Sequence, residues 1–330
     1  MTRISDWDSH IGRRIKLRDL YVFFVVVQQG SLSKAAAQLG VSHPAISQLI
    51  ANLEQDVGAE LLERSSRGVT PTVYGNALLA RGRAAFDELK NGIQEIQCLA
   101  DPEAGEVRVG CPEGLEAILL PAIETFSRRY PRVIIDIHVE ELETLAAKLH
   151  ARSLDFVLQL LRGYPRINDP FFDELKTEIL FEDELIVAAG GKSPWSRRTK
   201  IDLSELADEP WILTAPPSWN HGIIAEAFHA RGLPMPNVVI KTFSTYIRTH
   251  LVASGRFIAT FPKSVADFYA KRFLLKVLPV ELPDRPWPVA ILTLKNRKLG
   301  PAAYNFLTHV RDQTREVRNR KGASAHSRAR

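Results

Sequence analysis

The amino-acid sequence predicts a mixed α/β protein in three parts: an N-terminal winged helix-turn-helix, a long linker helix and a two-lobed α/β domain. Three observations support this class. A capped pair of short helices lies near residues 30–55, a proline-free helical segment follows it, and strands alternate with helices from about residue 105 onward. The predicted parts are an N-terminal extension at 1–15, the winged helix-turn-helix at 16–72, the linker helix at 73–100, the α/β domain at 105–313 and a basic, disordered tail at 314–330.

The helix pair is the most informative feature of the chain. The alanine-rich body from Lys34 to Leu39 favours a first helix, and Gly40 suits the left-handed conformation at its end. Pro44 fits the first turn of a second helix, where its missing N–H costs nothing. The serines able to cap these helices are Ser31 or Ser33 for the first and Ser42 for the second.

The second helix has the two faces that a DNA-reading helix needs. One face is an apolar stripe, and the other carries small polar groups that can reach base edges or phosphates. The segment from Glu63 to Thr72 then predicts a hairpin wing with two arginines. An ordinary helical hairpin with a solvated face would show the same spacing. The apolar stripe comprises Ala45, Ile46, Leu49, Ile50 and Leu53, and the candidate DNA-binding residues are Ser31, Ser33, Ser42, His43, Pro44, Ser47, Gln48, Arg64 and Arg67.

This region resembles the LysR-type transcriptional regulators over about sixty residues. The resemblance implies a winged helix-turn-helix that binds promoter DNA. Two positions depart from the family pattern, since His43 stands where the family often has glutamine and Gln48 where it often has arginine. The matching residues are Ser31, Ala35, Ala36, Leu39, Val41, Ser42, His43, Pro44, Ala45, Ile46, Ser47, Leu53, Glu54, Gly58, Leu61, Leu62, Arg64, Thr72 and Gly75.

The segment 73–100 predicts one long helix with an apolar seam. Apolar or small residues recur at alternating steps of three and four over about three heptads. Pairing with a second copy of the chain buries such a seam, and the resemblance implies the same dimer; the alternative is that the seam packs on its own domain. The candidate dimer residues are Leu79, Phe86, Leu89, Ile93 and Ile96.

From residue 105 the alternation of strands and helices predicts parallel sheets flanked by helices. The pattern restarts near residue 182, which predicts lobe I at 105–181 and 287–313 and lobe II at 182–286. Two lobes joined by two crossings resemble the periplasmic binding proteins, as the effector domains of LysR-type regulators do. The landmarks that match are Gly110, 119–121, 130–131, 154–157, 255–258 and 261–262.

Ligands of such sheets bind at the carboxyl ends of strands, between the lobes. N–H groups after the first strand favour an anion there. The family often has hydroxyl residues at the positions of Gly114 and Leu142, however, and this chain instead has Glu113, Glu141 and Glu143 nearby. A simple carboxylate is therefore less secure than in many members of the family, and a polyol, a sugar acid or a cationic ligand has equal weight. The candidate effector-binding residues are Cys111, Pro112, Glu113, Gly114, Glu141, Leu142, Thr214, Ser218, Trp219, Ser244 and Thr245.

Composition excludes several other classes. The formal net charge of +5 resides in residues 311–330, so the high pI is weak evidence for DNA binding. Cys98 and Cys111 have neither metal nor disulfide spacing, and no apolar run forms a signal core or spans a bilayer. We therefore expect a cytoplasmic protein without membrane association, metal or other cofactor.

The leading interpretation is a transcriptional regulator that binds a promoter as a dimer or a tetramer and responds to a small-molecule effector. The resemblance also implies contact with RNA polymerase. The alternative is a small-molecule binding protein with no DNA-binding role. An enzyme is not expected, because the sequence has no nucleophile elbow, phosphate-binding glycine loop, metal cluster or catalytic triad signature.

Overall fold

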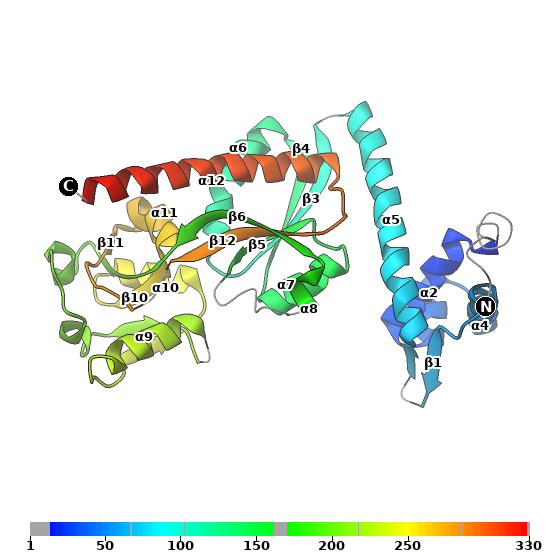
Figure 1. The fold of residues 1–330 in the computed structure, drawn as a ribbon, viewed down its shortest axis with the longest axis horizontal. Helices are drawn as coiled ribbons and strands as arrows, with labels where there is room; N and C mark the ends of the chain where they lie inside the picture. The colour runs from blue at the N-terminus through cyan, green and yellow to red at the C-terminus, as the bar shows by residue number, and fades with distance from the viewer. Residues whose placement is uncertain are drawn as a thin grey trace. The chain divides into compact units, whose positions relative to one another are not determined.

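The computed structural model describes residues 14–66, 68–101, 103–161, 170–216, 218–283 and 286–328. The chain divides into two compact units, residues 1–90 and 91–330 (Figure 1). No described helix has the length and apolar character needed to cross a membrane. The predicted N-terminal extension lies almost entirely outside the described residues.

The first unit is a winged helix-turn-helix. Ser31 and Ser42 are the N-caps of α3 and α4, and their hydroxyls accept hydrogen bonds from the backbone N–H groups of Lys34 and Ala45 at 3.4 Å. Gly40 ends α3 with φ of 65°, a conformation that favours glycine. The elements are α2 (Leu17–Gln29), α3 (Leu32–Leu39), α4 (His43–Val57), β1 (Leu62–Ser65) and β2 (Gly68–Pro71).

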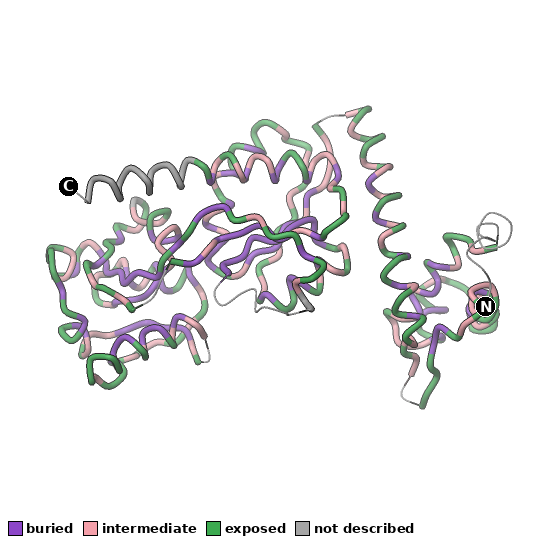
Figure 2. Tube along the Cα trace, viewed as in Figure 1, coloured by how far each residue is buried: buried purple, intermediate pink, exposed green. Residues whose placement is uncertain are grey.

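The apolar stripe of α4 faces the core of this unit. Ile46, Ile50 and Leu53 are buried together with residues of α2 and α3 (Figure 2). Ala45 is exposed, so the stripe predicted from the sequence begins one residue later. The strands of the wing pair antiparallel, with Leu62 opposite Pro71.

The linker helix α5 (Val73–Ala100) spans the predicted range, but its first half packs on its own chain. Leu79 is buried in the core of the first unit, and the Phe86 ring lies 5.5 Å from that of Phe24. A Cβ added at Gly82 would lie 2.5 Å from the Phe24 ring, so glycine admits that ring. Leu79 is therefore not accessible to a second copy of the chain, contrary to the prediction, whereas Phe86 is half-buried and its place in a dimer seam stays a prediction.

Lobe I of the second unit is a five-stranded sheet in the order β4-β3-β5-β12-β6. Alternate strand residues face opposite layers: α6 and α12 cover one face, and α7 covers the other. Figure 1 shows α12 lying along the sheet. The elements are β3 (Ala104–Cys111), α6 (Glu116–Arg129), β4 (Arg132–Val139), α7 (Leu142–His150), β5 (Phe156–Leu160), α8 (Pro170–Asp173), β6 (Leu175–Asp183), β12 (Trp287–Leu294) and α12 (Pro301–Arg328).

Lobe II is a second five-stranded sheet in the order β11-β7-β10-β8-β9. Helix α9 packs on one face, and α10 and α11 pack on the other. The elements are β7 (Leu185–Gly190), η3 (Pro194–Arg197), η4 (Leu203–Leu206), β8 (Trp211–Leu213), α9 (Trp219–His229), β9 (Val238–Lys241), α10 (Thr245–Ala253), β10 (Ile258–Pro262), α11 (Lys263–Phe273) and β11 (Leu275–Val277).

The chain crosses between the lobes twice, from β6 to β7 and from β11 to β12. Both sheets are mixed rather than parallel as predicted: β12 is antiparallel to β5 and β6, and β7 is antiparallel to β10 and β11. A strand that returns from the other lobe enters the sheet from the opposite end, which reverses its direction. The helix α11 and the strand β11 were not predicted from the sequence.

The basic tail differs from its prediction as well. The backbone of α12 stays helical to Arg328, whereas 314–330 was predicted to be disordered. Arg, Lys, Glu and Ala are good helix formers and extend the packed helix.

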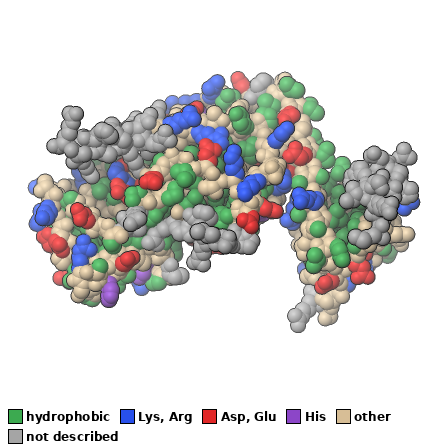
Figure 3. Space-filling view, viewed as in Figure 1, with side chains coloured by type: hydrophobic (Ala, Val, Ile, Leu, Met, Phe, Trp, Pro, Cys, Tyr) green, Lys and Arg blue, Asp and Glu red, His purple; other side chains and the backbone are tan. Residues whose placement is uncertain are grey.

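On the face shown in Figure 3, Lys and Arg side chains of the second unit lie interspersed with Asp and Glu side chains.

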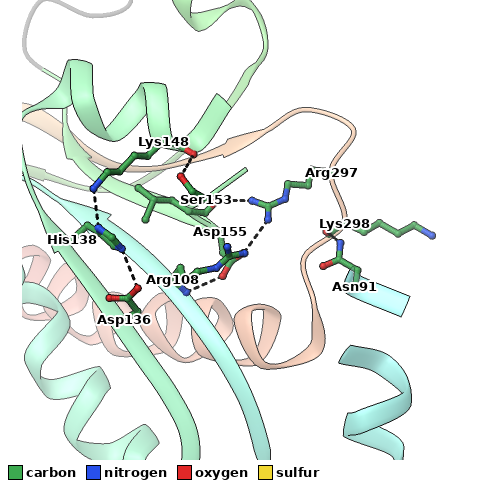
Figure 4. Close-up of polar contacts among 10 residues, drawn as sticks. Asn91, Arg108, Asp136, His138, Lys148, Ser153, Asp155, Arg297 and Lys298 are labelled. Carbon is green, nitrogen blue, oxygen red and sulfur yellow. Dashed lines mark hydrogen bonds and ion pairs between the residues drawn. The ribbon is translucent and has the colours of Figure 1, made fainter. Parts of the chain in front are cut away.

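A buried ion-pair network joins β3, β5 and the loop after β12 (Figure 4). Asp155 accepts hydrogen bonds from Arg108 Nη2 at 3.2 Å and from Arg297 Nη2 at 3.0 Å. The Arg108 backbone N–H also donates to Asp155 at 2.8 Å, and Arg297 Nη1 donates to the Leu154 carbonyl. The Arg297 side chain is 1% exposed. The network holds the loop that contains Arg297 against β3 and the residues just before β5.

The same loop contacts the second half of α5. Asn91 is buried, and its Nδ2 donates to the Lys298 carbonyl at 2.9 Å (Figure 4). A Cβ added at Gly300 would lie 2.4 Å from Gln94 Oε1, so the loop approaches α5 closely there. The end of the linker helix is therefore part of the second unit.

Candidate functional site: a DNA-reading face and an interlobe cleft

The first candidate site is the polar face of α4. His43 and Pro44 in its first turn and Gln48 in its body are exposed, and Ser47 is half-buried. Gln48 Nε2 donates to Asn52 Oδ1 at 2.9 Å, which holds the amide across the helix surface. The capped helix end and these side chains form the kind of surface that enters a DNA groove.

The wing lies next to this face. Arg64 of β1 is exposed, and its Nη1 donates to Ser47 Oγ at 3.5 Å. Glu54 Oε1 of α4 accepts hydrogen bonds from the backbone N–H groups of Leu61 at 2.8 Å and Leu62 at 3.2 Å. Glu54 therefore ties the wing to the reading helix, a role that the sequence analysis did not assign.

The predicted DNA-binding residues have two kinds of position. One group lies on or beside α4 and comprises Ser42, His43, Pro44, Ser47, Gln48 and Arg64. The other group, Ser31 and Ser33, lies at the start of α3. The structure assigns Ser31 as the N-cap and places Ser33 within the helix. Arg67 lies outside the described residues. The DNA-binding role of each residue stays a prediction.

The second candidate site is a cavity of about 560 Å³ between the two lobes. Its lining comes from the carboxyl ends of strands and the helix starts that follow them, as expected for such sheets. Three glutamates and one arginine are the charged groups of the lining. The lining residues are Pro112, Glu113, Gly114, Leu115, Glu141, Leu142, Glu143, Gln159, Leu160, Thr214, Ser218, Trp219, Asn220, Phe243, Arg248 and Pro262.

One polar cluster bridges the lobes within the cavity. Glu113 Oε1 of lobe I accepts a hydrogen bond of 2.7 Å from the backbone N–H of Thr245, at the start of α10 in lobe II. Arg248 is buried; it donates from Nη1 to the Thr260 carbonyl at 2.9 Å and from Nη2 to Thr245 Oγ1 at 3.0 Å. Burial lowers the pKa of Arg248 to about 10, while Glu113 and Glu116 act in the opposite direction. Arg248 is therefore still cationic at neutral pH.

Glu116 has a different environment from Glu113. Its Oε2 accepts a hydrogen bond of 2.5 Å from the Gly114 backbone N–H. Burial raises the pKa of Glu116, and the neighbouring Glu113 raises it further, although its hydrogen bonds and Arg248 oppose the shift. Glu113 and Arg248 thus line the cavity, and Glu116 lies within electrostatic range of both.

Most predicted effector-binding residues line the cavity, and three do not. Cys111 is fully buried in the core of lobe I, because it continues the inward face that Val107 and Val109 begin. Ser244 caps α10 by accepting from the Ile247 N–H at 3.4 Å, and Thr245 is buried beneath Arg248. The predicted contact of Cys111 with the effector is therefore wrong, and Ser244 and Thr245 position the helix that carries Arg248.

Asn220 and Phe243, which stand in the predicted polar loops of lobe II, line the cavity, whereas Gln159 and Arg248 are lining residues that the sequence did not predict. Gln159 lies within a continuous buried strand, so its sequence context reads as core. Arg248 lies one turn into α10, a helix that mixes polar and apolar residues, so its sequence context does not indicate that it is buried.

We expect Cys111 to be chemically inert. Burial is the main factor that raises the pKa of its thiol to about 12, and Glu116 and Glu113 add to it. The thiol therefore stays protonated far above neutral pH, and the thiolate is the reactive form. Iodoacetamide at pH 8 should modify the half-buried Cys98 and leave Cys111 unmodified, as read by peptide mass spectrometry of the native protein. Equal labelling of both cysteines would contradict this assignment.

The fold and the two sites together define a class of protein. A winged helix-turn-helix reads DNA, and a two-lobed domain with a polar interlobe cavity binds a small molecule. A chain that holds both is a ligand-responsive DNA-binding protein.

Comparison with known families gives the family. Residues 17–76 match the bacterial regulatory helix-turn-helix protein, lysR family, and residues 100–315 match the LysR substrate binding domain. The chain belongs to the LysR family of DNA-binding transcriptional regulators. This finding excludes the alternative of a binding protein without a DNA-binding role.

The chain is similar to characterised regulators over most of its length. The HTH-type transcriptional regulator GbpR of Azospirillum brasilense is 28% identical over 299 residues, which cover 90% of this chain and 86% of GbpR. The transcriptional dual regulator GltC of Bacillus subtilis is 27% identical over 306 residues, covering 90% of this chain and 96% of GltC.

Solved structures show the same fold. Full-length OxyR from Pseudomonas aeruginosa aligns with a TM-score of 0.58 at 23% identity, covering 91% of this chain and 95% of OxyR. A probable transcriptional regulator from the same organism aligns with a TM-score of 0.51 at 21% identity, covering 91% and 97%.

Proposed function

We propose that this chain regulates transcription in the cytoplasm by binding a two-fold promoter site as a dimer or a tetramer, without catalytic turnover. The reading surface is the exposed face of α4 together with the wing. The observation that carries this proposal is the contact between Arg64 of the wing and Ser47 of α4, which unites two DNA-facing elements in one surface. RNA polymerase is the proposed further partner, as the family implies.

We propose that the effector binds in the interlobe cavity and acts through lobe closure. The Glu113–Thr245 hydrogen bond joins the two lobes at the cavity, so a ligand there contacts both. An effector shifts the equilibrium between two arrangements only through a difference in its affinity for them. The cavity provides such a difference, because its lining is complete only when the lobes are held together.

The test of DNA binding is footprinting of the purified protein on the region upstream of its own gene. We expect a protected two-fold site. The variants Arg64→Ala and Ser47→Ala should each weaken binding, by about 1–3 kcal/mol if the side chain contacts a base. Unchanged footprints for both variants would show that another surface reads DNA.

Arg83→Ala is the matched control, because Arg83 is exposed on α5 and lies outside the proposed surface. It should leave affinity near that of the parent protein. If Arg83→Ala weakens binding as much as Arg64→Ala does, the loss reflects overall charge rather than the reading surface.

A further inference from the structure

The cleft contains two buried polar atoms that have no hydrogen-bond partner among the described residues. Gln159 of β5 in lobe I donates from Nε2 to the Leu160 carbonyl at 3.1 Å, which leaves its Oε1 as an unsatisfied acceptor. Arg248 of α10 in lobe II uses both Nη atoms, which leaves Nε–H as an unsatisfied donor. Both residues line the cavity, and their exposed fractions are 8% and 5%. Buried polar groups normally have partners, so a ligand that fills the cavity has one donor and one acceptor to supply.

The charge of the cleft disfavours an anionic ligand. The N–H at the start of α10, where an anion would bind, already donates to Glu113. Glu113 and Glu116 lie within electrostatic range of Arg248, so its positive charge is already balanced inside the chain. Glu141 and Glu143 are exposed at the lining and add negative charge. A carboxylate ligand would have to displace Glu113 or lie among these glutamates.

The charge of a cationic ligand complements the glutamates of the lining but not Arg248. An ammonium group has donors and no acceptor, so it leaves Arg248 Nε–H unsatisfied and places a second positive charge beside the guanidinium. An amino acid carries a carboxylate into the same field of glutamates. Neither class satisfies both unpartnered atoms without an electrostatic cost.

A hydroxyl group both donates and accepts, so a neutral ligand with several hydroxyls satisfies both atoms. Its hydroxyls also donate to Glu141 and Glu143, as carboxylates accept strong hydrogen bonds. Trp219 and Phe243 offer apolar ring surface in the same lining. We propose that the effector is a neutral polyhydroxylated compound, a monosaccharide or a sugar alcohol, held between Gln159 of lobe I and Arg248 of lobe II. This inference rests on the proposed role of the cavity as the effector site.

The test is isothermal titration calorimetry of the full-length protein with defined probes. The probes are aldopentoses, aldohexoses and alditols, the matching aldonic and uronic acids, four-carbon dicarboxylates, amino acids and aliphatic diamines. We expect saturable binding by at least one neutral probe, with weaker binding by the matching sugar acid. Saturable binding confined to acids, amino acids or amines, or an absence of binding by every neutral probe, would overturn the assignment.

Two variants test the residues. Gln159→Leu keeps the volume of the side chain, removes the unsatisfied acceptor and should weaken binding of the neutral probe about tenfold, the size of one hydrogen bond. Gln313→Leu makes the same substitution on α12, outside the cavity, and should leave affinity unchanged. Equal affinity in the Gln159→Leu variant and the parent would overturn the proposed contact, with circular dichroism confirming that both variants are folded.

The double variant Glu141→Gln and Glu143→Gln tests the charge argument. It should raise the affinity for the sugar acid relative to the neutral sugar, because two negative charges leave the lining. An unchanged ratio would overturn the electrostatic selection. Footprinting with the parent protein separates the two proposals. If the parent protects DNA but binds no neutral probe, only the proposed ligand class is refuted. If the parent protects no DNA, the proposed function is refuted.

Discussion

Replacing Ile93 with aspartate is expected to dissociate the dimer. Leu89, Ile93 and Ile96 continue the seam of α5 beyond the part that α2 covers, and their exposed fractions are 47%, 56% and 67%. Burial of one such side chain contributes about 1.5–3 kcal/mol, and a two-fold interface contains each residue twice. Ile93→Asp should therefore raise the dimer dissociation constant by about two to four orders of magnitude, as measured by analytical ultracentrifugation.

Glu95→Lys is the matched control for this prediction. Glu95 lies on the same helix and is exposed, and it stands two residues after Ile93 and one before Ile96, so it faces away from the seam. It should change the dissociation constant far less. Leu79→Asp should behave differently again, because it places a charge in the core of the first unit and unfolds the winged helix-turn-helix. A dimer that survives Ile93→Asp would show that α5 is not the interface.

Removing the carboxylate of Asp155 is expected to destabilise the second unit strongly. Asp155 is the acidic partner of two arginines, Arg108 and Arg297, whose side chains are 16% and 1% exposed. Breaking a buried ion pair by removing one partner typically costs about 3–5 kcal/mol. Asp155→Ala should lower the free energy of unfolding by this amount. Urea unfolding followed by tryptophan fluorescence measures it, because four of the five tryptophans lie in residues 91–330.

Asp136→Ala provides the comparison for an exposed polar contact in the same sheet. Asp136 lies 3.1 Å from His138, and its side chain is 49% exposed. Solvent screens such a pair, so the expected cost is below about 1 kcal/mol. Equal destabilisation by the two variants would mean that burial of the Asp155 network contributes little.

Local signals in the sequence predicted much of the fold. Helix ends depend on nearby backbone groups, so short segments of sequence predict them. Gly40 ends α3, Ser42 caps the start of α4, and Pro44 lies in the first turn of α4. The direction of β12 is not local, since it depends on the chain returning from lobe II. The same limit applies to Leu79, because the core that buries it includes α2, which is distant in the sequence.

The candidate cleft was predictable only where it follows a strand end. Pro112, Glu113 and Glu141 stand at such ends and line the cavity as predicted. Gln159 and Arg248 lie inside a buried strand and a helix, and only the packing of the two lobes brings them to one cavity. The partners Asp155 and Arg297 are separated by 142 residues, so no sequence spacing could pair them.

The division of α5 between the two units has a consequence for building hybrid regulators. Leu79 and Phe86 belong to the packing of the DNA reader, whereas Asn91 and Gln94 belong to the packing of the effector domain. If two regulators were fused at the end of α5, the residue at position 91, which donates to the Lys298 carbonyl, would come from the other protein. Exchange of reading heads between relatives should therefore be made inside the helix, between Phe86 and Asn91, where each module keeps its own contacts.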